Sequence, residues 1–526
     1  MARLPRVCRQ AIGFRPRLRA GCLALVAALA FTPSATAQAT GQRATSRIGY
    51  AYPAGGQQGT TTTVALGGQN LNGATAAYFS GTGVQAKVIG YDRPLTQKEL
   101  NDAREKIQQL QDKRAATRHT ASDSAAMPAK PVWTADDEKT LADLRLMIAM
   151  RQNRQINPAL AETVTLEVTL APDATPGERE VRLKTPAGLS NPLVYCVGQL
   201  PEFSEPAVSA TSQPAPAGPN RYSGPSTRRS RPPMAITLPA TVNGQVLPGE
   251  TDRFQFSARQ GQRLTVSASA RALIPYLADA VPGWFQATLA LYDGKGREVA
   301  YDDDFRFNPD PVLSYAIPAD GDYTIEIKDS IYRGREDFVY RIAIGELPFV
   351  TSVFPLGSGF QDRASFEIAG WNLPLDQLSM ETKNKSPGTF LLSVRNQGVL
   401  SNPVRFALDT QPDCREAEPN ETSDTAQPLE LPMIVNGRID RAGDEDVFRF
   451  AGKAGSEFIA EIFARRLSSP LDSVLKLTDA SGRQLAFNDD YEDKGAGLTT
   501  HHADSRLSVT LPADGAYYVR VADAQH

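Results

Sequence analysis

The sequence has few of the residues that build disulfide scaffolds, zinc sites or membrane spans. Its 526 residues include four cysteines and four histidines, and Cys8 and Cys22 fall in the N-terminal signal region. Two remaining cysteines are too few for a disulfide-stapled scaffold. Beyond the N-terminal segment no stretch approaches the ~20 apolar residues of a membrane span, so we expect none within residues 1–526. A net charge of -3 gives no basic field, so we expect no nucleic-acid partner.

Catalytic motifs are absent as well. The sequence contains neither the His-Glu-x-x-His motif of zinc peptidases nor the Gly-x-Ser-x-Gly nucleophile elbow. Carboxylate pairs are numerous, but the sequence assigns none of them an acid–base role. We therefore expect residues 1–526 to be non-catalytic.

The N-terminus has the pattern of an export signal. Six arginines between Arg3 and Arg19 precede the apolar run Gly21–Phe31, and Ala35-Thr36-Ala37 is a small-x-small cleavage site. The apolar run is too short to span a membrane. We expect residues 1–37 to be a signal peptide and the mature protein to be exported to the periplasm, the cell surface or the medium.

Two long segments of the chain are repeats of each other. Gly249–Arg271 matches Gly443–Arg465, Leu289–Asp304 matches Leu475–Asp490, and Pro318–Tyr323 matches Pro512–Tyr517. Within each repeat, apolar residues alternate with polar ones over short runs that are separated by Asp-Gly turns. This pattern is typical of half-buried strands in an antiparallel β-sandwich.

A second kind of β segment precedes each repeat. Gly188–Pro192 recurs as Val399–Pro403, and these segments are also expected to form small sandwiches. The first of them carries an insertion, residues 95–158, with helical spacing and a Thr96-x-x-Glu99 capping box. We expect an antiparallel helical hairpin there, either as a spacer or as a surface for a partner.

The predicted fold class is therefore mainly β: tandem antiparallel β-sandwiches with one inserted α-helical hairpin. Residues 206–233 are rich in Pro, Ser and Arg and are expected to form a solvated linker. The predicted domain boundaries are 1–37, 45–200, 206–233, 234–346, 347–409 and 410–526.

The two repeats resemble bacterial pre-peptidase C-terminal domains, which are jelly-roll-like modules attached to secreted peptidases. The residues that carry this resemblance are Gly443–Phe450, Leu471–Leu475, Asn488–Asp490 and Asp514–Tyr517. The segments between the repeats look like immunoglobulin-like TIG domains. The whole arrangement is similar to large exported proteins of planctomycete-type bacteria.

The resemblance implies a structural calcium site in the second repeat. In the collagenase members of the family, an acidic linker and a Gly-Asp-x-Asp turn bind calcium. The matching residues here are Glu416, Glu418, Asn420, Asp444 and Asp446, with Glu421 and Asp490 as further candidates. Calcium prefers six to eight oxygen ligands, and such a cluster of acids repels itself without a cation. Alternatively, these acids cap turns and keep sheet edges soluble.

The first repeat departs from this pattern. Its turn is Glu250-Thr251-Asp252, and Glu205-Pro206-Ala207 stands where the acidic linker would be. The second repeat differs in another way, because the closing strand expected at Phe338–Ile344 has no counterpart before His526. We expect the second sandwich to lack its last strand and the sequence to be a fragment of a longer protein.

Three functions remain open. The first is an exported scaffold or binding protein whose ligand is an unidentified protein or polysaccharide outside the cytoplasm. The second is the non-catalytic N-terminal part of a secreted peptidase. The third is carbohydrate recognition, for which Trp284, Phe285 and Trp371 are aromatic candidates, although core packing is the usual role of such residues.

Overall fold

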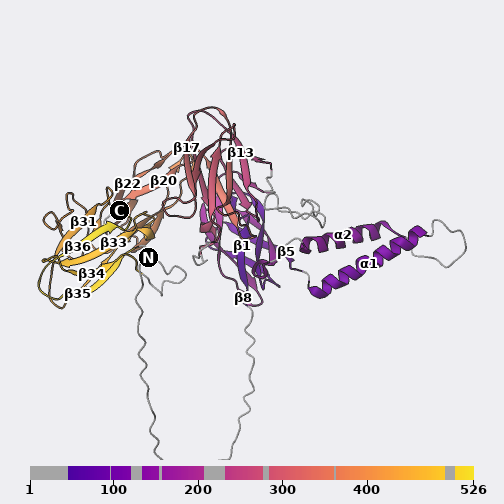
Figure 1. Cartoon of the computed structure of the whole chain (residues 1–526), viewed down its shortest axis with the longest axis horizontal. Coiled ribbons are helices and arrows are strands. Elements are labelled where there is room, and N and C mark those ends of the chain that lie inside the picture. The colour runs from indigo at the N-terminus through magenta and orange to yellow at the C-terminus, as the bar shows by residue number, and fades with distance from the viewer. Residues whose placement is uncertain are drawn as a thin grey trace, which may run out of the picture. The chain divides into compact units, whose positions relative to one another are not determined.

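The computed structural model describes residues 45–94, 96–119, 133–152, 157–205, 232–275, 284–359, 363–491 and 504–525 (Figure 1). The predicted signal peptide and residues 206–231 of the predicted linker lie outside the described residues. The described residues form four β-sandwiches and one pair of helices, so the predicted fold class is confirmed. None of the described helices is long and apolar enough to cross a membrane.

The first sandwich packs a sheet of order β1-β3-β6-β5 against a sheet of order β2-β9-β7-β4, with β8 paired to β7. Alternate residues of β3 and β6, among them Val64, Leu66, Leu166 and Val168, are fully buried between the sheets. The elements are β1 (Arg47–Tyr52), β2 (Gly55–Gln57), β3 (Thr61–Gln69), β4 (Ala76–Phe79), β5 (Val84–Asp92), η1 (Pro158–Leu160), β6 (Glu162–Leu170), β7 (Gly177–Thr185), β8 (Gly188–Leu189) and β9 (Leu193–Gly198).

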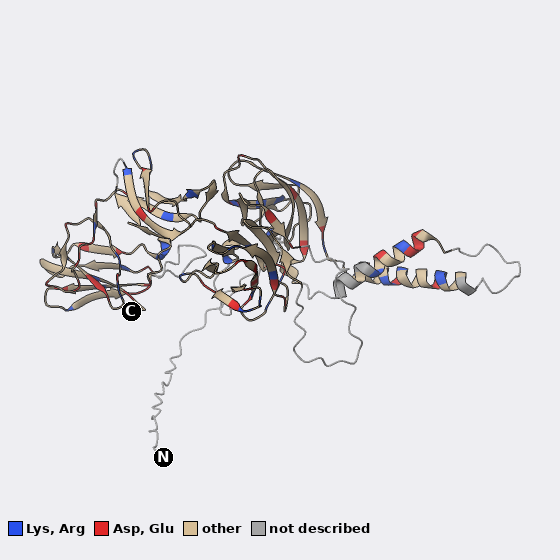
Figure 2. Cartoon of the chain, turned by 90° about the horizontal axis from the view of Figure 1, so that it is seen from above, with Lys and Arg blue, Asp and Glu red and all other residues tan. Residues whose placement is uncertain are grey.

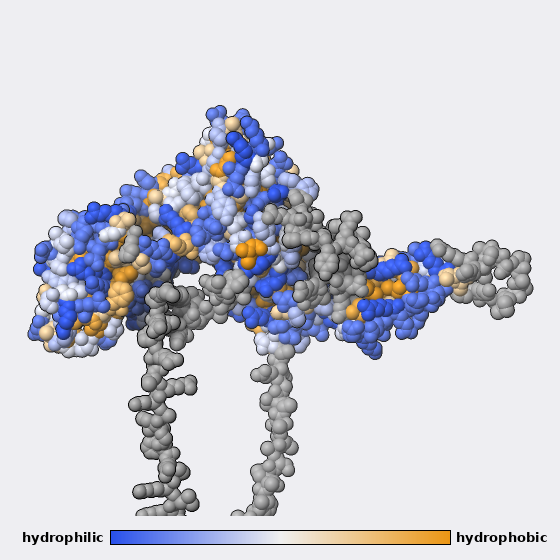
Figure 3. All heavy atoms as spheres, viewed as in Figure 1, coloured by the Kyte–Doolittle hydropathy of each residue, from blue (hydrophilic) through white to orange (hydrophobic). Residues whose placement is uncertain are grey.

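A helical pair, α1 (Gln97–His119) and α2 (Ala135–Gln152), is inserted between β5 and β6. The predicted capping box is confirmed, because the Glu99 amide donates to Thr96 Oγ1 at 3.2 Å and the Thr96 amide donates to Glu99 Oε2 at 2.7 Å. Apolar side chains gather along the seam between the two helices (Figure 3), where Leu110 and Leu141 are buried. Charged residues of both signs are also present in the pair (Figure 2), and Lys113 and Asp137 form an ion pair at 2.6 Å.

The second sandwich packs a sheet of order β10-β12-β19-β14-β17 against one of order β11-β13-β18-β15-β16. It begins before the predicted boundary at residue 234, because β10 pairs in parallel with β12. Its core contains Phe254, Ile325, Tyr340 and Ile342, all with no exposed surface. The elements are β10 (Glu202–Ser204), β11 (Met234–Ala235), β12 (Ala240–Gln245), β13 (Asp252–Ala258), β14 (Arg263–Ser269), η3 (Arg271–Leu273), β15 (Ala287–Tyr292), β16 (Glu298–Asp302), β17 (Val312–Ala316), β18 (Gly321–Asp329) and β19 (Val339–Gly345).

The third sandwich is smaller, with sheets of order β20-β22-β23 and β21-β27-β24 and the short pair β25-β26. Buried and exposed residues alternate along β22, which places Ala364, Phe366 and Ile368 in the core. The elements are β20 (Phe349–Phe354), β21 (Gly357–Gly359), β22 (Arg363–Trp371), β23 (Gln377–Glu381), β24 (Gly388–Leu392), β25 (Arg395–Asn396), β26 (Val399–Leu400) and β27 (Val404–Asp409).

The fourth sandwich repeats the second, with one difference. One sheet has the order β29-β31-β36-β33-β34, while the strands facing it form two separate pairs, β28-β30 and β32-β35. Among its described residues no strand joins these two pairs, whereas β19 joins β12 to β14 in the second sandwich. The elements are β28 (Asp413–Arg415), β29 (Gln427–Pro428), β30 (Ile434–Asn436), β31 (Glu445–Gly452), β32 (Glu457–Glu461), η4 (Arg465–Leu467), β33 (Ser473–Asp479), β34 (Gln484–Asn488), β35 (Arg506–Thr510) and β36 (Gly515–Asp523).

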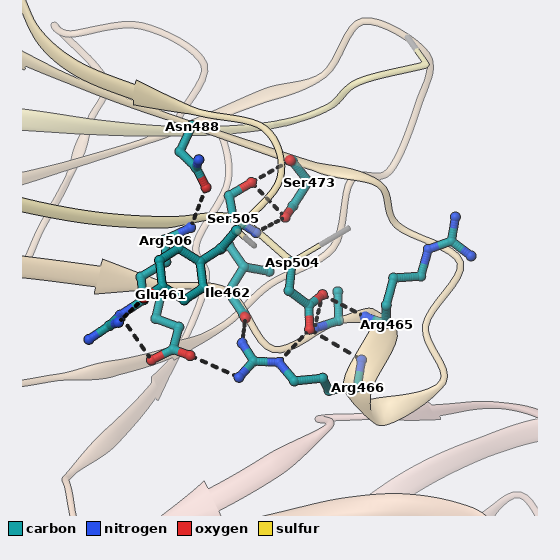
Figure 4. Close-up of polar contacts among 11 residues, drawn as sticks. Glu461, Ile462, Arg465, Arg466, Ser473, Asn488, Asp504, Ser505 and Arg506 are labelled. Atoms are coloured by element: carbon teal, nitrogen blue, oxygen red, sulfur yellow. Dashed lines mark hydrogen bonds and ion pairs between the residues drawn. The ribbon is translucent and has the colours of Figure 1, made fainter. Parts of the chain in front are cut away.

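In both repeats a buried aspartate holds a turn, which follows β14 in the second sandwich and β32 in the fourth. In the fourth sandwich, Asp504 accepts hydrogen bonds from the amides of Ala464 at 3.0 Å and Arg465 at 2.7 Å, and from Arg466 Nε at 2.7 Å (Figure 4). Asp310 accepts from the equivalent amides before and within η3. In both turns the buried carboxylate accepts hydrogen bonds from backbone amides at the start of the short helix, so these donors are satisfied.

Candidate metal centre

Two separate pieces of chain bring the acidic residues of the fourth sandwich together. Glu416 directly follows β28, and its amide donates to the carbonyl of Asn436 at 3.0 Å, which ties the linker to β30. Asp446 is the second residue of β31, and the amide of the next residue, Val447, donates to the carbonyl of Asn420 at 2.9 Å. These backbone hydrogen bonds place the linker 416–421 beside the start of β31.

Glu416, Glu418 and Asp446 form the centre of this acidic cluster. Each offers a carboxylate oxygen, and these oxygens all lie within 4.8 Å of one another. Asn420 has no exposed surface, and Asp446 is 3% exposed. Carboxylate and amide oxygens at this spacing form the kind of site that calcium occupies in proteins.

Hydrogen bonds orient the linker side chains but leave two oxygens unused. Asn420 Nδ2 donates to Glu416 Oε1 at 2.8 Å, and the Asn420 amide donates to Glu418 Oε2 at 2.9 Å. Asn420 Oδ1 and Asp446 Oδ1, by contrast, are buried and accept no hydrogen bond from any described residue. Burying an acceptor without a donor is costly, and Asp446 Oδ1 belongs to a carboxylate of the acidic cluster, where a cation could satisfy it.

The remaining candidates occupy different places. Asp444 is buried and accepts from the Asp440 amide at 2.8 Å, and it contributes to the negative field on Asp446. Glu421 is paired with Arg441 at 2.6 Å. Asp490 is exposed and follows β34, three strands from β31 in the sheet, which corresponds to about 14 Å at the usual strand spacing. The structure therefore brings Glu416, Glu418 and Asp446 together and places Asp490 apart from them.

Burial and, to a lesser extent, mutual repulsion raise the pKa values of two acids in the cluster. Burial raises the pKa of Asp446 to about 9, and a hydrogen bond shared with Glu416 and the charges of Glu416, Asp444 and Glu418 add to the effect. The pKa of Glu418 is also raised, mainly by desolvation. Without a cation, Asp446 therefore holds a proton at neutral pH.

The second sandwich treats the corresponding aspartate differently. Asp252 is the first residue of β13 and Asp446 the second residue of β31, and Glu205 follows β10 as Glu416 follows β28. Here Tyr340 of β19 donates its hydroxyl to Asp252 Oδ2 at 2.9 Å. Burial and the nearby acids, Asp252 first, raise the pKa of Tyr340 well above its usual value, so the phenol keeps its proton. The hydroxyl of Tyr340 thus satisfies one carboxylate oxygen of Asp252.

The aromatic candidates for sugar binding are engaged in packing. Phe285 is 2% exposed, and Trp284 donates its indole N–H to Asp337 Oδ2 at 3.1 Å. Trp371 stacks on Phe349 with ring centroids 5.3 Å apart. These contacts account for the three aromatic residues without a sugar.

Comparison with known families agrees with this architecture. The model of the bacterial pre-peptidase C-terminal domain matches residues 444–523. The match therefore covers β31 to β36 of the fourth sandwich. The match includes Asp444 and Asp446, while the linker acids from Glu416 to Glu421 precede it.

Among curated proteins, a probable subtilase-type serine protease of Deinococcus radiodurans is 37% identical over 138 residues. The aligned region covers 26% of this chain and 17% of the relative, so the chain corresponds to a small part of the relative's length. The relative is a protease by name, and it shares with this chain a segment about the size of one sandwich and its linker.

Solved structures give weaker likenesses. The pre-peptidase C-terminal domain of a collagenase from Bacillus anthracis aligns over 23% of this chain and 99% of its own, at 12% identity and a TM-score of 0.17. The secreted serine protease VesC from Vibrio cholerae aligns over 56% of this chain and 48% of its own, at 7% identity and a TM-score of 0.14. These scores are too low to relate the folds in detail.

Proposed function

We propose that the pre-peptidase C-terminal domain binds one calcium ion with Glu416, Glu418, Asn420, Asp444 and Asp446. The observation that carries the proposal is the cluster of Glu416, Glu418 and Asp446, in which the buried Asp446 Oδ1 accepts no hydrogen bond from the described residues. Four carboxylates and one amide carbonyl match the oxygen ligands that calcium prefers, and bidentate carboxylates can supply the six to eight oxygens it needs.

The role of the ion is structural. Linker residues Glu416 to Asn420 lie between β28 and β31 in the sequence, and the carboxylates of Glu416 and Glu418 lie close to that of Asp446. A cation there joins the linker to the sandwich, because it holds both pieces of chain at once. Binding to the folded state alone stabilises that state by mass action. Calcium is plentiful outside the cytoplasm, in keeping with the predicted export signal.

Calorimetric titration of the 526-residue chain with calcium tests the site. We expect binding by the unmodified protein and by Asp490→Asn, and its loss in Asp446→Asn. Asp490→Asn is the matched control, because it removes the same charge from the same domain about 14 Å away. If Asp446→Asn bound calcium as well as the unmodified protein, the site would have to lie elsewhere. If the unmodified protein bound no calcium at millimolar concentration, the acids would only cap turns.

For the chain as a whole, we propose an exported, non-catalytic multidomain protein that acts as a scaffold or binding protein outside the cytoplasm. Its support is the tandem sandwich architecture and the lack of zinc-peptidase and nucleophile-elbow motifs in the sequence. We also propose that the first and third sandwiches are TIG-like domains. The proposal includes the similarity of the whole arrangement to large exported proteins of planctomycete-type bacteria. Cleavage after Ala37 is its first test, by N-terminal sequencing of protein from the culture supernatant and the periplasm.

A second candidate function is favoured by the Deinococcus relative, which is a probable serine protease by name. In this case the sandwiches are non-catalytic modules of a secreted peptidase. Labelling the protein isolated from its own source with a fluorophosphonate probe separates the two functions. A labelled polypeptide that also reacts with antibody against residues 413–523 supports the peptidase, and an unlabelled one supports the scaffold.

A further inference from the structure

The third sandwich lacks two strands that the first sandwich has. In the first, β4, β5 and the helical pair lie between β3 and β6 in the sequence, and β5 and β4 pair with the outer edges of β6 and β7. In the third, β22 leads to β23 through residues 372–376 alone. In the described part of this sandwich, no strand pairs with the outer edge of β23 or of β24. Both edges are open because this internal connection is short.

The missing strands leave apolar side chains of β23 partly uncovered. Leu378 of β23 pairs with Phe366 as Leu166 of β6 pairs with Val64, and Phe366 and Val64 stand at the same distance before a shared Asn-Leu pair. β23 therefore takes the place of β6. Leu166 has no exposed surface, because β5 lies beside its strand, whereas Leu378 and Met380 are only partly buried against the core.

The first sandwich protects its outer edge against further pairing, and the third does not. β5 carries the exposed Lys87 in its middle, and its register with β6 shifts between Val88 and Gly90. Lysines and bulges are devices that keep an edge strand from pairing with another chain. The edge strands β16 and β34 also pair through shifted registers. β23 contains neither lysine nor proline, and its register with β22 is regular from Gln377 to Glu381.

The edge of the facing sheet has lost a charge as well. Leu391 of β24 pairs with Arg405, and Glu180 of β7 pairs with Val194. Arg405 and Val194 each stand two residues after the shared Ser-Asn-Pro motif, so Leu391 is the counterpart of Glu180. Leu391 is 66% exposed, and β24 pairs with β27 in a regular register. Charged side chains discourage pairing at an edge, and here leucine replaces one.

The sequence of β23 is complementary to itself when two copies run antiparallel. About a twofold axis at Ser379, Leu378 lies opposite Met380 of the second copy, and Gln377 lies opposite its Glu381. Both apolar residues are on the core side of the strand, so the two copies would continue one apolar face. No like charges lie opposite each other, which is a condition for stable cross-strand pairs. A self-complementary patch of this kind suits a twofold dimer.

We propose that β23 pairs antiparallel with β23 of a second copy of the chain, so that the two third sandwiches join edge to edge across a twofold axis. The joined sheet has the order β20-β22-β23-β23-β22-β20. Main-chain hydrogen bonds satisfy both edges, and Leu378 and Met380 of each copy gain burial. The second copy is the occupant because the strand matches its own sequence. The contact uses none of the proposed calcium ligands.

Sedimentation equilibrium of the 526-residue chain tests the association, for which we expect a reversible dimer. Ser379 is exposed, and Ser379→Lys places two ammonium groups opposite each other at the twofold axis. We expect its dissociation constant to rise by about tenfold at low salt and by less at high salt, because ions screen the repulsion. A chain that stays monomeric at its highest soluble concentration would overturn the proposal.

Gln85→Lys is the matched control for the added charge. Gln85 is also exposed, on the edge strand of the first sandwich, and we expect a dissociation constant within about twofold of the unmodified protein. Equal weakening by Ser379→Lys and Gln85→Lys would contradict a contact at β23, and so would a dimer that Ser379→Lys leaves unchanged.

A cysteine pair tests the register directly. Opposite Cα atoms of an antiparallel pair are about 4.5–5.5 Å apart, which is within disulfide range, so Ser379→Cys should crosslink under mild oxidation. Ser365 is exposed and pairs with Ser379 one strand farther from the axis. Its two copies would be about 14 Å apart, three strand spacings, so Ser365→Cys should crosslink no more than the unmodified protein. Crosslinking in both variants, or in neither, would overturn the pairing of β23 with itself.

Discussion

The second and fourth sandwiches share a strand plan but stabilise the same aspartate by opposite means. In the second, β19 closes the sheet and brings Tyr340, whose hydroxyl donates to Asp252. In the fourth, no described strand takes this place, and Asp446 faces Glu416 and Glu418. A buried carboxylate needs a hydrogen-bond donor, a proton or a cation. The two repeats have the same fold but surround this carboxylate with different groups.

The largest expected effect comes from removing the tyrosine that closes the second sandwich. Tyr340 has no exposed surface and packs edge-on against Phe254. We expect Tyr340→Ala to lower the free energy of unfolding of this sandwich by about 3–5 kcal/mol, the usual cost of deleting a buried aromatic ring. Denaturant unfolding followed by hydrogen exchange in β13 and β31 measures the two sandwiches separately. A loss that is equal in β31 would show that the two repeats do not unfold independently.

Calcium is expected to act on the fourth sandwich alone. At a free concentration one hundred times the dissociation constant, the ion adds about 2.7 kcal/mol to the stability of the state that binds it. Differential scanning calorimetry with calcium and with chelator should therefore shift one transition and leave the others in place. Tyr340→Ala identifies the unfolding transition of the second sandwich. If calcium shifted that transition, the second sandwich would also bind the ion, which would contradict the difference proposed between the two repeats.

The pH dependence of calcium binding sharpens the contrast further. Because the pKa of Asp446 is raised to about 9, the folded state holds a proton on this residue between its ordinary range near 3.8 and pH 9, where the unfolded chain does not. The ion-free domain therefore loses stability as the pH rises through this window. Calcium must displace the proton, so its affinity should rise with pH by up to about tenfold per unit, or 1.4 kcal/mol. Titrations at several pH values check this slope, and Asp446→Asn should remove the stability change.

The smallest effect is expected from the hydroxyl of Tyr340. Tyr340→Phe keeps the ring but removes the hydrogen bond to Asp252, so we expect a loss of about 1 kcal/mol. The same variant tests whether the Tyr340 hydroxyl alone makes a cation unnecessary beside Asp252. If it alone does so, calcium should stabilise Tyr340→Phe more than the unmodified second sandwich. An unchanged calcium response would instead assign the difference to the missing acids, since Ala207 and Ser209 stand in the sequence where the fourth sandwich has Glu418 and Asn420.

The sequence by itself determined the β class, the repeats and the start of the helical pair. Alternation of apolar residues and the Thr96–Glu99 capping box are local patterns, and the structure contains both features. The acids of the linker and the turn were also predicted as a group, because the resemblance carried them residue by residue. These properties depend on neighbours that are close in the chain, so the order of the residues is sufficient to predict them.

Only the tertiary structure decided which groups meet. Glu416 and Asp446 are 30 positions apart in the numbering, and the linker's backbone hydrogen bonds to β30 and β31 bring them together. Asp490 was predicted with them but follows a strand at the other side of the sheet. The pairing of Tyr340 with Asp252 and the open edge of β23 likewise depend on which strand lies next to which. Strand order is a property of packing over long sequence separations, and local spacing does not specify it.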